Sequence, residues 1–243
     1  MSKTLLITGA STGLGAETAR QLAEGNEIFI HYNASKEPAE QVAADVEKKG
    51  GKAYLLQADL SKEKGCRNLV KGVCDQTAKL DVLVNNAGGL IRRNPVREYE
   101  WKLMEDVFAL NIFSAMMVSS LCIPLLEKGD DPCIINMTSV AIRHGAPTAT
   151  FYGAAKAALD SFTRGAAKEL APTIRVNSVA PGVILTPFHD KVSTPEQLET
   201  FRENTPLKKH GDPIHIALTI KFIIENNFVT GESLDINGGL FMR

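Results

Sequence analysis

The segment TLLITGASTGLG, residues 4–15, decides the expected fold of this chain. A short apolar strand (Thr4–Thr8) runs directly into a glycine-rich turn and then into an amphipathic helix. Gly9 lets the chain turn sharply, Gly13 lets the backbone approach a ligand, and Gly15 lets the helix pack on a sheet. The N-terminus of this helix would offer N–H groups to a pyrophosphate. The spacing differs from the commoner G-x-G-x-x-G, so a glycine turn without a ligand is the alternative.

The rest of the chain repeats the order of strand and helix. Further strands are expected at Ile28–Tyr32, Ala53–Gln57, Val82–Asn85, Cys133–Met137, Ile174–Val179 and Ser233–Ile236. Helices are expected up to Gly25, at Glu37–Lys49, up to Ala78, and at Glu98–Glu127, Phe151–Leu170 and Pro213–Glu225. Strict alternation implies a parallel sheet with helices on both faces and ligands beyond the carboxyl ends of its strands. The predicted fold class is α/β, a doubly wound, Rossmann-type parallel sheet in three αβα layers.

Length and composition favour a single domain over residues 1–243. The chain is 44 % hydrophobic, enough for one sizeable core, and no repeat or low-complexity linker divides it. Its net charge of −1 is dispersed, so no nucleic-acid or membrane partner is expected. The 4 cysteines lack metal-ligand spacing, which favours reduced thiols in the cytoplasm and no metal site. We see neither a signal peptide nor an apolar run of membrane-spanning length.

A second informative segment is Phe151–Lys156, in an alanine-rich helix. Tyr152 and Lys156 would lie one turn apart on the same helix face. A phenol has a pKa of about 10 and is a poor acid or base at neutral pH, but a nearby ammonium would lower that pKa. Without further support, such a pair more often places an aromatic ring on the core and a charged group in water.

Several motifs follow the order and spacing of the short-chain dehydrogenase/reductase family. They are Thr8-Gly9-x-x-x-Gly13-x-Gly15, Asn85-Asn86-Ala87-Gly88, Asn111, Ser139, Tyr152-x-x-x-Lys156 and Pro181-Gly182. The resemblance covers essentially the whole chain, and within the family the chain is most similar to 3-oxoacyl-[acyl-carrier-protein] reductase-like and sugar dehydrogenase-like branches. It implies an NAD(P)-dependent oxidoreductase that reduces a carbonyl or oxidises an alcohol by hydride transfer.

Alternatives to this function remain open. A sugar or polyol dehydrogenase is the alternative within the family, and a non-catalytic nicotinamide redox sensor is the alternative of another class. The proton-transfer residues favour an enzyme, because a pure sensor need not keep them. The substrate is expected to be a small carbonyl compound or alcohol.

The resemblance implies a role for each polar residue of the motifs. Tyr152 would be the general acid and base, and Lys156 would lower its pKa and bond the nicotinamide ribose. Ser139 would hydrogen-bond the substrate oxygen, and Asn111 would hold a water in a proton relay. Taken singly, Ser139 would more often be a strand-end cap and Asn111 a structural residue of a helix.

The same resemblance implies the cofactor contacts. Asp59 would bond the adenine amino group and Leu60 would cover the ring, with a helix-start carboxylate as the alternative for Asp59. Ile184 and Thr186 would meet the carboxamide of the cofactor. The cofactor-binding candidates are Gly9, Ser11, Thr12, Gly13, Leu14, Gly15, Tyr32, Asn33, Ser35, Asp59, Leu60, Asn86, Ala87, Gly88, Tyr152, Lys156, Pro181, Gly182, Ile184 and Thr186.

Cofactor choice depends on the end of the second strand, where an acid would bond the ribose hydroxyls of NAD and repel a 2′-phosphate. Tyr32 occupies or adjoins this position, and residues 33–36 contain no acid. We therefore expect NADP(H) to be preferred and NAD(H) to be possible, with Ser35 and Lys36 near the phosphate. Thr12 argues the other way, because many NADP-dependent relatives carry Arg or Lys there.

The substrate end and the assembly are less constrained. Arg92, Arg93 and His144 are open candidates for substrate contact, and Phe188–Thr205 resembles the variable segment that closes over substrate. The resemblance also implies a homotetramer, in which the helices Glu98–Glu127 and Phe151–Leu170 pack against their copies. The small residues expected to allow this close approach are Ala154, Ala157, Ala158, Ser161 and Ala166.

Overall fold

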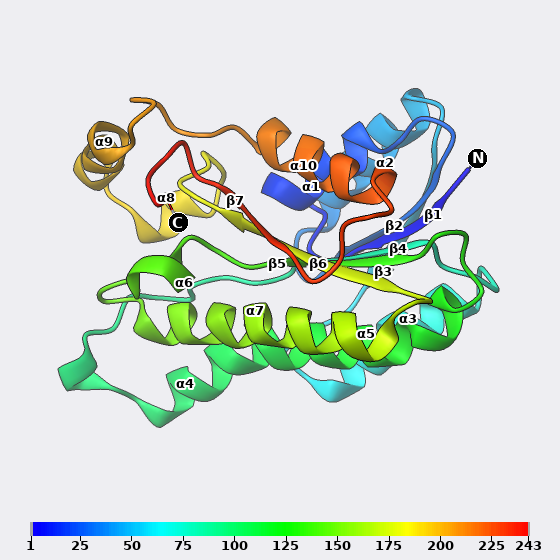
Figure 1. The fold of residues 1–243 in the computed structure, drawn as a ribbon, viewed down its shortest axis with the longest axis horizontal. Coiled ribbons are helices and arrows are strands. Elements are labelled where there is room, and N and C mark those ends of the chain that lie inside the picture. The colour runs from blue at the N-terminus through cyan, green and yellow to red at the C-terminus, as the bar shows by residue number, and fades with distance from the viewer. Residues whose placement is uncertain (1, 243) are drawn as a thin grey trace.

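The computed structural model describes residues 2–242. Its parallel strands form one 7-stranded sheet in the order β3-β2-β1-β4-β5-β6-β7 (Figure 1). Chain order reverses between β1 and β4, and ligands of doubly wound sheets bind at such a switch point. The doubly wound parallel sheet predicted from the alternation is confirmed. The strands are β1 (Thr4–Ile7), β2 (Glu27–Tyr32), β3 (Lys52–Gln57), β4 (Val82–Asn85), β5 (Cys133–Met137), β6 (Arg175–Pro181) and β7 (Ser233–Ile236).

Helices cover both faces of the sheet (Figure 1). One face carries α1 (Gly13–Gln21), α2 (Lys36–Lys48) and α10 (Pro213–Glu225). The other carries α3 (Glu63–Cys74), α5 (Ser114–Leu126) and α7 (Thr150–Leu170), with α4 (Trp101–Phe108) beside them. At the carboxyl edge lie α6 (Ala141–His144), α8 (His189–Val192) and α9 (Pro195–Asn204). Short turns are the 3₁₀ turn η1 (Val96–Glu98) and the π-helical turn η2 (Ala109–Phe113).

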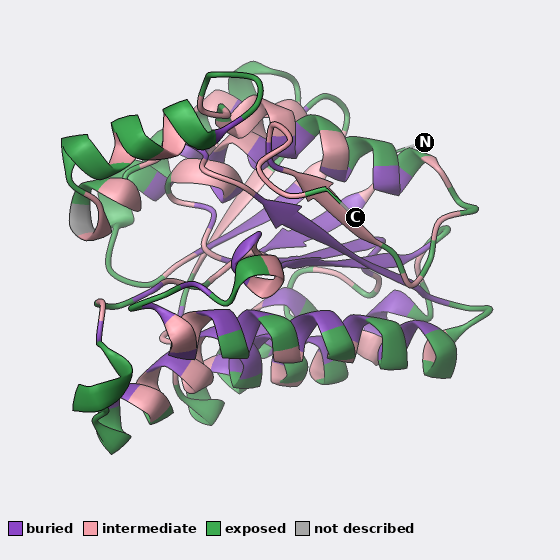
Figure 2. Ribbon diagram, turned by 60° about the vertical axis from the view of Figure 1, so that its left-hand side comes forward, coloured by how far each residue is buried: buried purple, intermediate pink, exposed green. Residues whose placement is uncertain are grey.

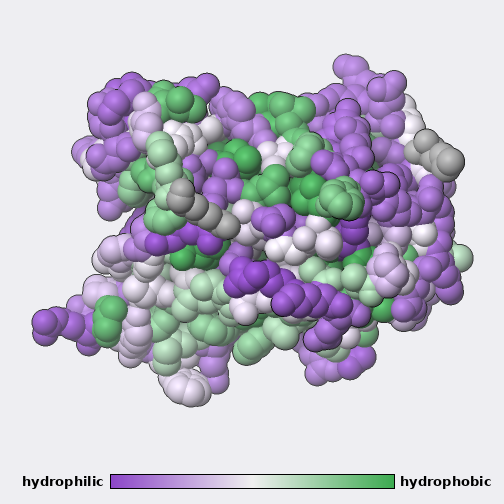
Figure 3. Space-filling view, in the orientation of Figure 1, coloured by the Kyte–Doolittle hydropathy of each residue, from purple (hydrophilic) through white to green (hydrophobic). Residues whose placement is uncertain are grey.

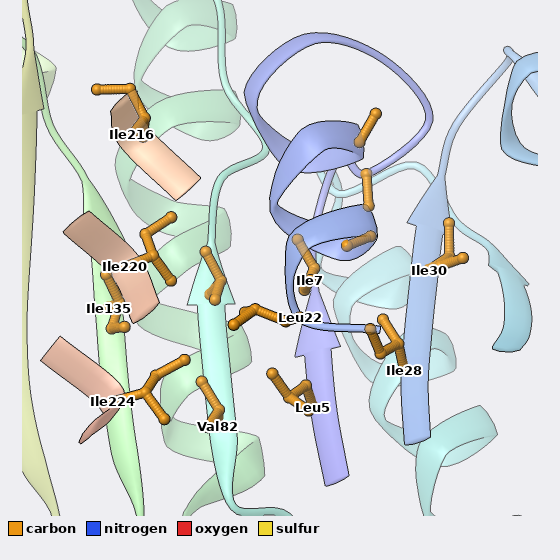
Figure 4. Close-up of a cluster of buried hydrophobic side chains, with 14 of the residues drawn as sticks. Leu5, Ile7, Leu22, Ile28, Ile30, Val82, Ile135, Ile216, Ile220 and Ile224 are labelled. Carbon is orange, nitrogen blue, oxygen red and sulfur yellow. The ribbon is translucent and has the colours of Figure 1, made fainter. Parts of the chain in front are cut away.

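The core has two layers, one on each face of the sheet. Alternate residues of a strand point to opposite faces, so Leu5 and Ile7 pack under α1, α2 and α10 (Figure 4). Leu6 and Phe29 pack on the opposite face, under α3, α5 and α7. Figure 2 shows the buried strands between helices that are buried only on their inner sides. This is the continuous burial expected of a parallel sheet.

One apolar helical run differs from expectation. Trp101–Leu126 is 26 residues long and is the one run among residues 2–242 long and apolar enough to cross a membrane by length and composition. The expectation that no apolar run reaches this length is therefore wrong. Half of its most apolar window is buried inside the fold, where Val118 and Cys122 join the core. Burial in this core accounts for part of its composition.

The small-residue surface of α7 is largely as expected. Ala154, Ala157 and Ser161 are exposed and Ala158 is partly exposed. In Figure 3 the surface over α7 shows pale green atoms beside hydrophilic, purple ones. The expectation is wrong for Ala166, which is buried in the core and does not belong to this surface. It lies 12 residues after Ala154, about a third of a turn away from that face at roughly 100° per residue.

Candidate active site

A cleft of about 860 Å³ opens at the carboxyl edge of the sheet. This volume is within the range of cofactor and substrate pockets, about 300–1,000 Å³. Most of the site residues predicted from the sequence line it, although they come from distant parts of the chain. They are Gly9, Ser11, Thr12, Gly13, Leu14, Asn33, Ser35, Asp59, Leu60, Asn86, Ala87, Gly88, Ser139, Tyr152, Lys156, Pro181, Gly182, Ile184 and Thr186.

Gly15, Tyr32 and Asn111 do not line the cleft. Gly15 lies against the turn, where an added Cβ would come within 2.6 Å of Gly9 O, so glycine here lets the start of α1 pack closely on the turn. The expected cofactor contact of Tyr32 is not supported, because its side chain packs on the core under α1 and α2. Its neighbour His31 points to the opposite face and lines the cleft instead.

The glycine-rich turn is held by hydrogen bonds to β4 and the segment after it. Gly9 and Gly13 have φ of +62° and +58°, values that favour glycine. Asn86 Nδ2 donates to Thr8 O and Gly9 O, each at 2.9 Å. No side chain caps the N-terminus of α1 at Thr12, so its first N–H groups remain available to a ligand. This arrangement fits the pyrophosphate of a dinucleotide.

His31 is a residue that the sequence analysis missed. Its side chain is only 2 % exposed, Nδ1 accepts from Gly9 N at 2.9 Å, and Nε2 lies 3.0 Å from Ala58 O. Because the Gly9 amide is a donor, Nδ1 is unprotonated and Nε2–H donates to Ala58 O. Burial lowers the pKa of His31. The available signal was a histidine one residue before the end of an apolar strand that leads to the cofactor edge.

Asp59 lines the cleft, and its carboxylate is also bound by residues just before α3. It lines the cleft beside Leu60. Its carboxylate also accepts from Ser61 N at 3.1 Å and Ser61 Oγ at 2.6 Å, and Lys62 Nζ lies 3.0 Å away. The bond from Ser61, followed by that from Lys62, lowers the pKa of Asp59. The carboxylate is thus ionised and fixed just before α3.

The segment after β2 shows which of its polar groups reach the part of the cleft where the ribose is expected. Asn33 and Ser35 line it. Lys36 does not, since its Nζ lies 3.4 Å from Glu40 Oε1 on an exposed face of α2. The phosphate contact expected of Lys36 is therefore not supported.

The Tyr152–Lys156 pair lies where β5 ends. Lys156 Nζ donates to Met137 O at 2.7 Å and is 5.7 Å from the centre of the Tyr152 ring. Burial lowers the pKa of Lys156 to about 8. Burial also raises the pKa of Tyr152, and a hydrogen bond with the Ser139 side chain works in the opposite direction. The predicted net lowering of the Tyr152 pKa is therefore not observed, because desolvation of the phenol dominates.

Asn111 lies in η2, the π-helical turn between α4 and α5. Its Nδ2 donates to Val107 O at 2.9 Å and Gly89 O at 2.8 Å, and its Oδ1 accepts from Gly89 N at 3.0 Å. A Cβ at Gly88 would lie 2.7 Å from Asn111 Oδ1 and 3.0 Å from Lys156 Nζ. Glycine at this position therefore lets Asn111 and Lys156 approach the same backbone segment.

The three open candidates for substrate contact, Arg92, Arg93 and His144, differ in whether they reach the cleft. Arg93 and His144 line the cleft. Arg92 does not, because its guanidinium pairs with Glu100 at 2.6 Å. The segment expected to close over substrate forms α8 and α9, and its Phe188 ring lies 6.4 Å from that of Tyr152, centre to centre.

Together, a glycine-rich turn at an uncapped helix and a Ser–Tyr–Lys set in one cleft define an NAD(P)-dependent oxidoreductase. Comparison with known proteins gives the family. The chain belongs to the short-chain dehydrogenase family, whose sequence model matches residues 3–197.

Its relatives include several reductases. The 3-oxoacyl-[acyl-carrier-protein] reductase FabG of Staphylococcus epidermidis is 35 % identical over 250 residues, covering 100 % of both chains. The crystal structure of the angucycline C-6 ketoreductase LanV with bound NADP has 28 % identity and a TM-score of 0.91, covering 99 % of this chain and 98 % of that one. The NADH-dependent reductase A1-R′, responsible for alginate metabolism, has 28 % identity and a TM-score of 0.91, covering 100 % and 98 %. The redox-sensor and polyol-dehydrogenase alternatives are not favoured.

Proposed function

We propose that this enzyme reduces a small carbonyl compound to an alcohol with NADPH, using Tyr152 as the general acid. The observation that carries the proposal is the convergence of Ser139, Tyr152 and Lys156 on the cleft that the glycine-rich turn also lines. The whole of residues 1–243 would serve as one dinucleotide-binding oxidoreductase domain.

The cofactor would supply the hydride, and the residues of this chain would supply position and a proton. Tyr152 donates its phenolic proton to the carbonyl oxygen as that oxygen becomes an alcohol. Ser139 donates a hydrogen bond to the same oxygen and stabilises its developing negative charge. Tyr152 is protonated before the reaction, as a proton donor must be, and the hydrogen bond with Ser139 lowers its pKa against the effect of burial.

Lys156 and Asn111 would support this proton transfer. Lys156 Nζ is fixed by Met137 O and lies beside the phenol. A cationic Lys156 stabilises the phenolate after its proton has left. Asn111 holds the backbone of Gly89 at this side of the cleft and would position a water for reprotonation.

The cofactor proposal is a preference for NADP(H), with NAD(H) possible. Residues 33–36 carry no acid to repel a 2′-phosphate, and Asn33 and Ser35 face the cleft. Solved relatives include a ketoreductase with bound NADP and an NADH-dependent reductase, so both cofactors occur on this fold.

Two substrate classes merit testing. The bacterial relatives support a 3-oxoacyl thioester, the substrate class named for FabG. A polar, negatively charged carbonyl compound is favoured by Arg93, which lines the substrate end of the cleft.

We further propose a cytoplasmic homotetramer without nucleic-acid or membrane partners. Support comes from the net charge of −1 and from the exposed small residues of α7. Trp101, Phe113 and Met116, on the neighbouring helical run, are exposed apolar side chains. Burial of such a face against a second copy would stabilise the assembly.

The test is a reduction assay with purified protein, followed through the loss of NADPH absorbance at about 340 nm. Acetoacetyl-coenzyme A and ethyl acetoacetate serve as carbonyl substrates. Turnover that requires Tyr152 supports the proposal. Turnover of neither substrate, nor of acetoacetate, with either reduced cofactor would overturn it.

A further inference from the structure

The substrate end of the cleft has an asymmetric charge distribution. Arg93 is partly buried and lines this end together with His144 and His189. Asp59 is the one carboxylate among the described lining residues, and it lies at the adenine end. Burial, together with the charges of His210 and Arg93, lowers the pKa of His189, whereas Asp190 works in the opposite direction. Arg93 therefore carries the permanent charge at this end.

Arg93 is held in place by its neighbours while its charge stays unpaired. Nε donates to Val192 O at 3.0 Å, and Nη1 donates to Thr148 Oγ1 at 3.2 Å. Both acceptors are neutral, and no carboxylate pairs with Arg93 among residues 2–242. The neighbouring Arg92 shows the contrast, because Glu100 neutralises it outside the cleft. An oriented guanidinium without an acid is a suitable partner for an anion.

The guanidinium is linked, through one backbone carbonyl, to the apolar cluster that contains Tyr152. Val192, whose carbonyl binds Arg93, packs in one apolar cluster with Leu90 and Tyr152. Arg93 and Tyr152 also line the same cleft. A substrate whose carbonyl meets Tyr152 would therefore extend toward Arg93.

We propose that Arg93 forms a carboxylate-binding subsite, and that the enzyme prefers carbonyl substrates that carry a carboxylate. This inference rests on the proposed reductase function and names its substrate class. A carboxylate would accept from the remaining N–H groups of Arg93, and the imidazoles of His144 and His189 line the same cleft as further polar groups.

The test compares oxo acids with their neutral esters. Pyruvate, acetoacetate and levulinate are paired with methyl pyruvate, ethyl acetoacetate and methyl levulinate, because these acids place the carboxylate at increasing distance from the carbonyl. We expect at least one acid to have a kcat/KM about 10- to 100-fold above that of its ester. In Arg93→Met this ratio should fall to about 1, and Arg93→Lys should retain part of it.

Arg92→Met is the matched control and should keep the ratio of the parent enzyme. Because each ratio compares two substrates of one variant, general damage to folding cancels. If the enzyme reduces the esters but prefers none of the acids, the proposed reductase function stands and the carboxylate subsite is refuted. A preference that survives in Arg93→Met also overturns it. If no substrate is reduced, the binding of acetoacetate is measured by calorimetric titration of the parent and of Arg93→Met. Equal binding in the two proteins, or no binding in either, counts against the subsite.

Discussion

The Gly9 amide donates a hydrogen bond to His31 Nδ1 at 2.9 Å, joining the glycine-rich turn to the end of β2. The opposite ring nitrogen, Nε2, lies 3.0 Å from Ala58 O, next to Asp59. A single buried imidazole thus connects the segments expected to hold the pyrophosphate and the adenine. The imidazole must be neutral for this, because a protonated Nδ1 cannot accept from Gly9.

Removing this connection should weaken cofactor binding. In His31→Ala, the Gly9 amide and the Ala58 carbonyl each lose a buried hydrogen-bond partner. Leaving such a group unpaired costs about 1–3 kcal/mol of free energy. We expect the Kd for NADPH, measured by fluorescence titration, to rise about 5- to 100-fold. Tyr32→Phe is the control, since the Tyr32 side chain packs away from the cleft. An unchanged Kd in His31→Ala would show that the hydrogen bonds of His31 do not support cofactor binding.

The same histidine predicts a pH dependence of stability. Burial lowers the pKa of His31 in the folded protein below its ordinary 6.5. The unfolded chain then binds a proton that the folded protein does not, so the free energy of unfolding decreases as pH falls below 6.5. Urea unfolding at several pH values should show that the free energy of unfolding falls more steeply below pH 6.5 in the parent than in His31→Gln. Parallel pH profiles would refute this.

Tyr152→Phe should remove turnover and leave cofactor binding nearly intact, because only the proton-transfer group is lost. We expect kcat to fall about 10²- to 10⁴-fold with little change in the NADPH Kd. Stopped-flow measurement of turnover and fluorescence titration separate these effects. Turnover within about tenfold of the parent would exclude Tyr152 as the general acid.

Lys156→Met should abolish activity without destabilising the protein at pH 7. The ordinary pKa of 10.5 falls to about 8 on burial, which corresponds to a cost of about 3 kcal/mol for the buried ammonium at low pH. The bond to Met137 O offsets part of this cost.

The stability of Lys156→Met relative to the parent should decrease as pH rises. Because the folded pKa lies below the unfolded one, the cost is fully present below about pH 8 and disappears between about 8 and 10.5. Thermal melts of parent and variant from pH 7 to 10 show whether the difference in stability changes with pH in this direction. A variant that melts far below the parent at pH 7 would show that the Met137 bond dominates.

Cofactor preference should depend on Asn33 and not on Lys36. Asn33→Asp places an acid in the cleft near the expected ribose position, so kcat/KM with NADPH should fall relative to NADH by about tenfold or more. Lys36→Glu should leave the ratio unchanged, because Lys36 pairs with Glu40 outside the cleft. Steady-state kinetics with both cofactors measure the ratio. A parent enzyme with a higher kcat/KM for NADH would overturn the NADPH preference.

A bulky charge on α7 should disrupt the proposed homotetramer. Ala157 is exposed on the small-residue face, and Ala157→Arg would prevent close helix approach and desolvate a cation. Light scattering at micromolar concentration should show a smaller species for this variant. Glu47→Arg, on the exposed surface of α2, is the control. A parent protein that is already monomeric would refute the assembly.

The sequence by itself determined the sheet, the helices and the motifs at the cleft. These features depend on local patterns. Apolar runs bounded by turns predict buried strands, a glycine can be recognised wherever it follows a strand, and Tyr152 and Lys156 share a face because a helix repeats every 3.6 residues. Even Ala166 could have been assigned to the core from this period, since it lies off the face that holds Ala154.

Only the tertiary structure decided which side chains at these positions reach the cleft and in what state of charge. His31, and not its neighbour Tyr32, faces the cofactor end because it bonds Gly9 and Ala58, which are 22 and 27 residues away. Arg92 and Arg93 look alike in the sequence, but only Arg92 meets an acid, at Glu100. The Tyr152 pKa rises although Lys156 is one turn away, because desolvation depends on everything packed around the ring. Such contacts and burial arise only when distant segments are brought together, and for that reason local patterns do not contain them.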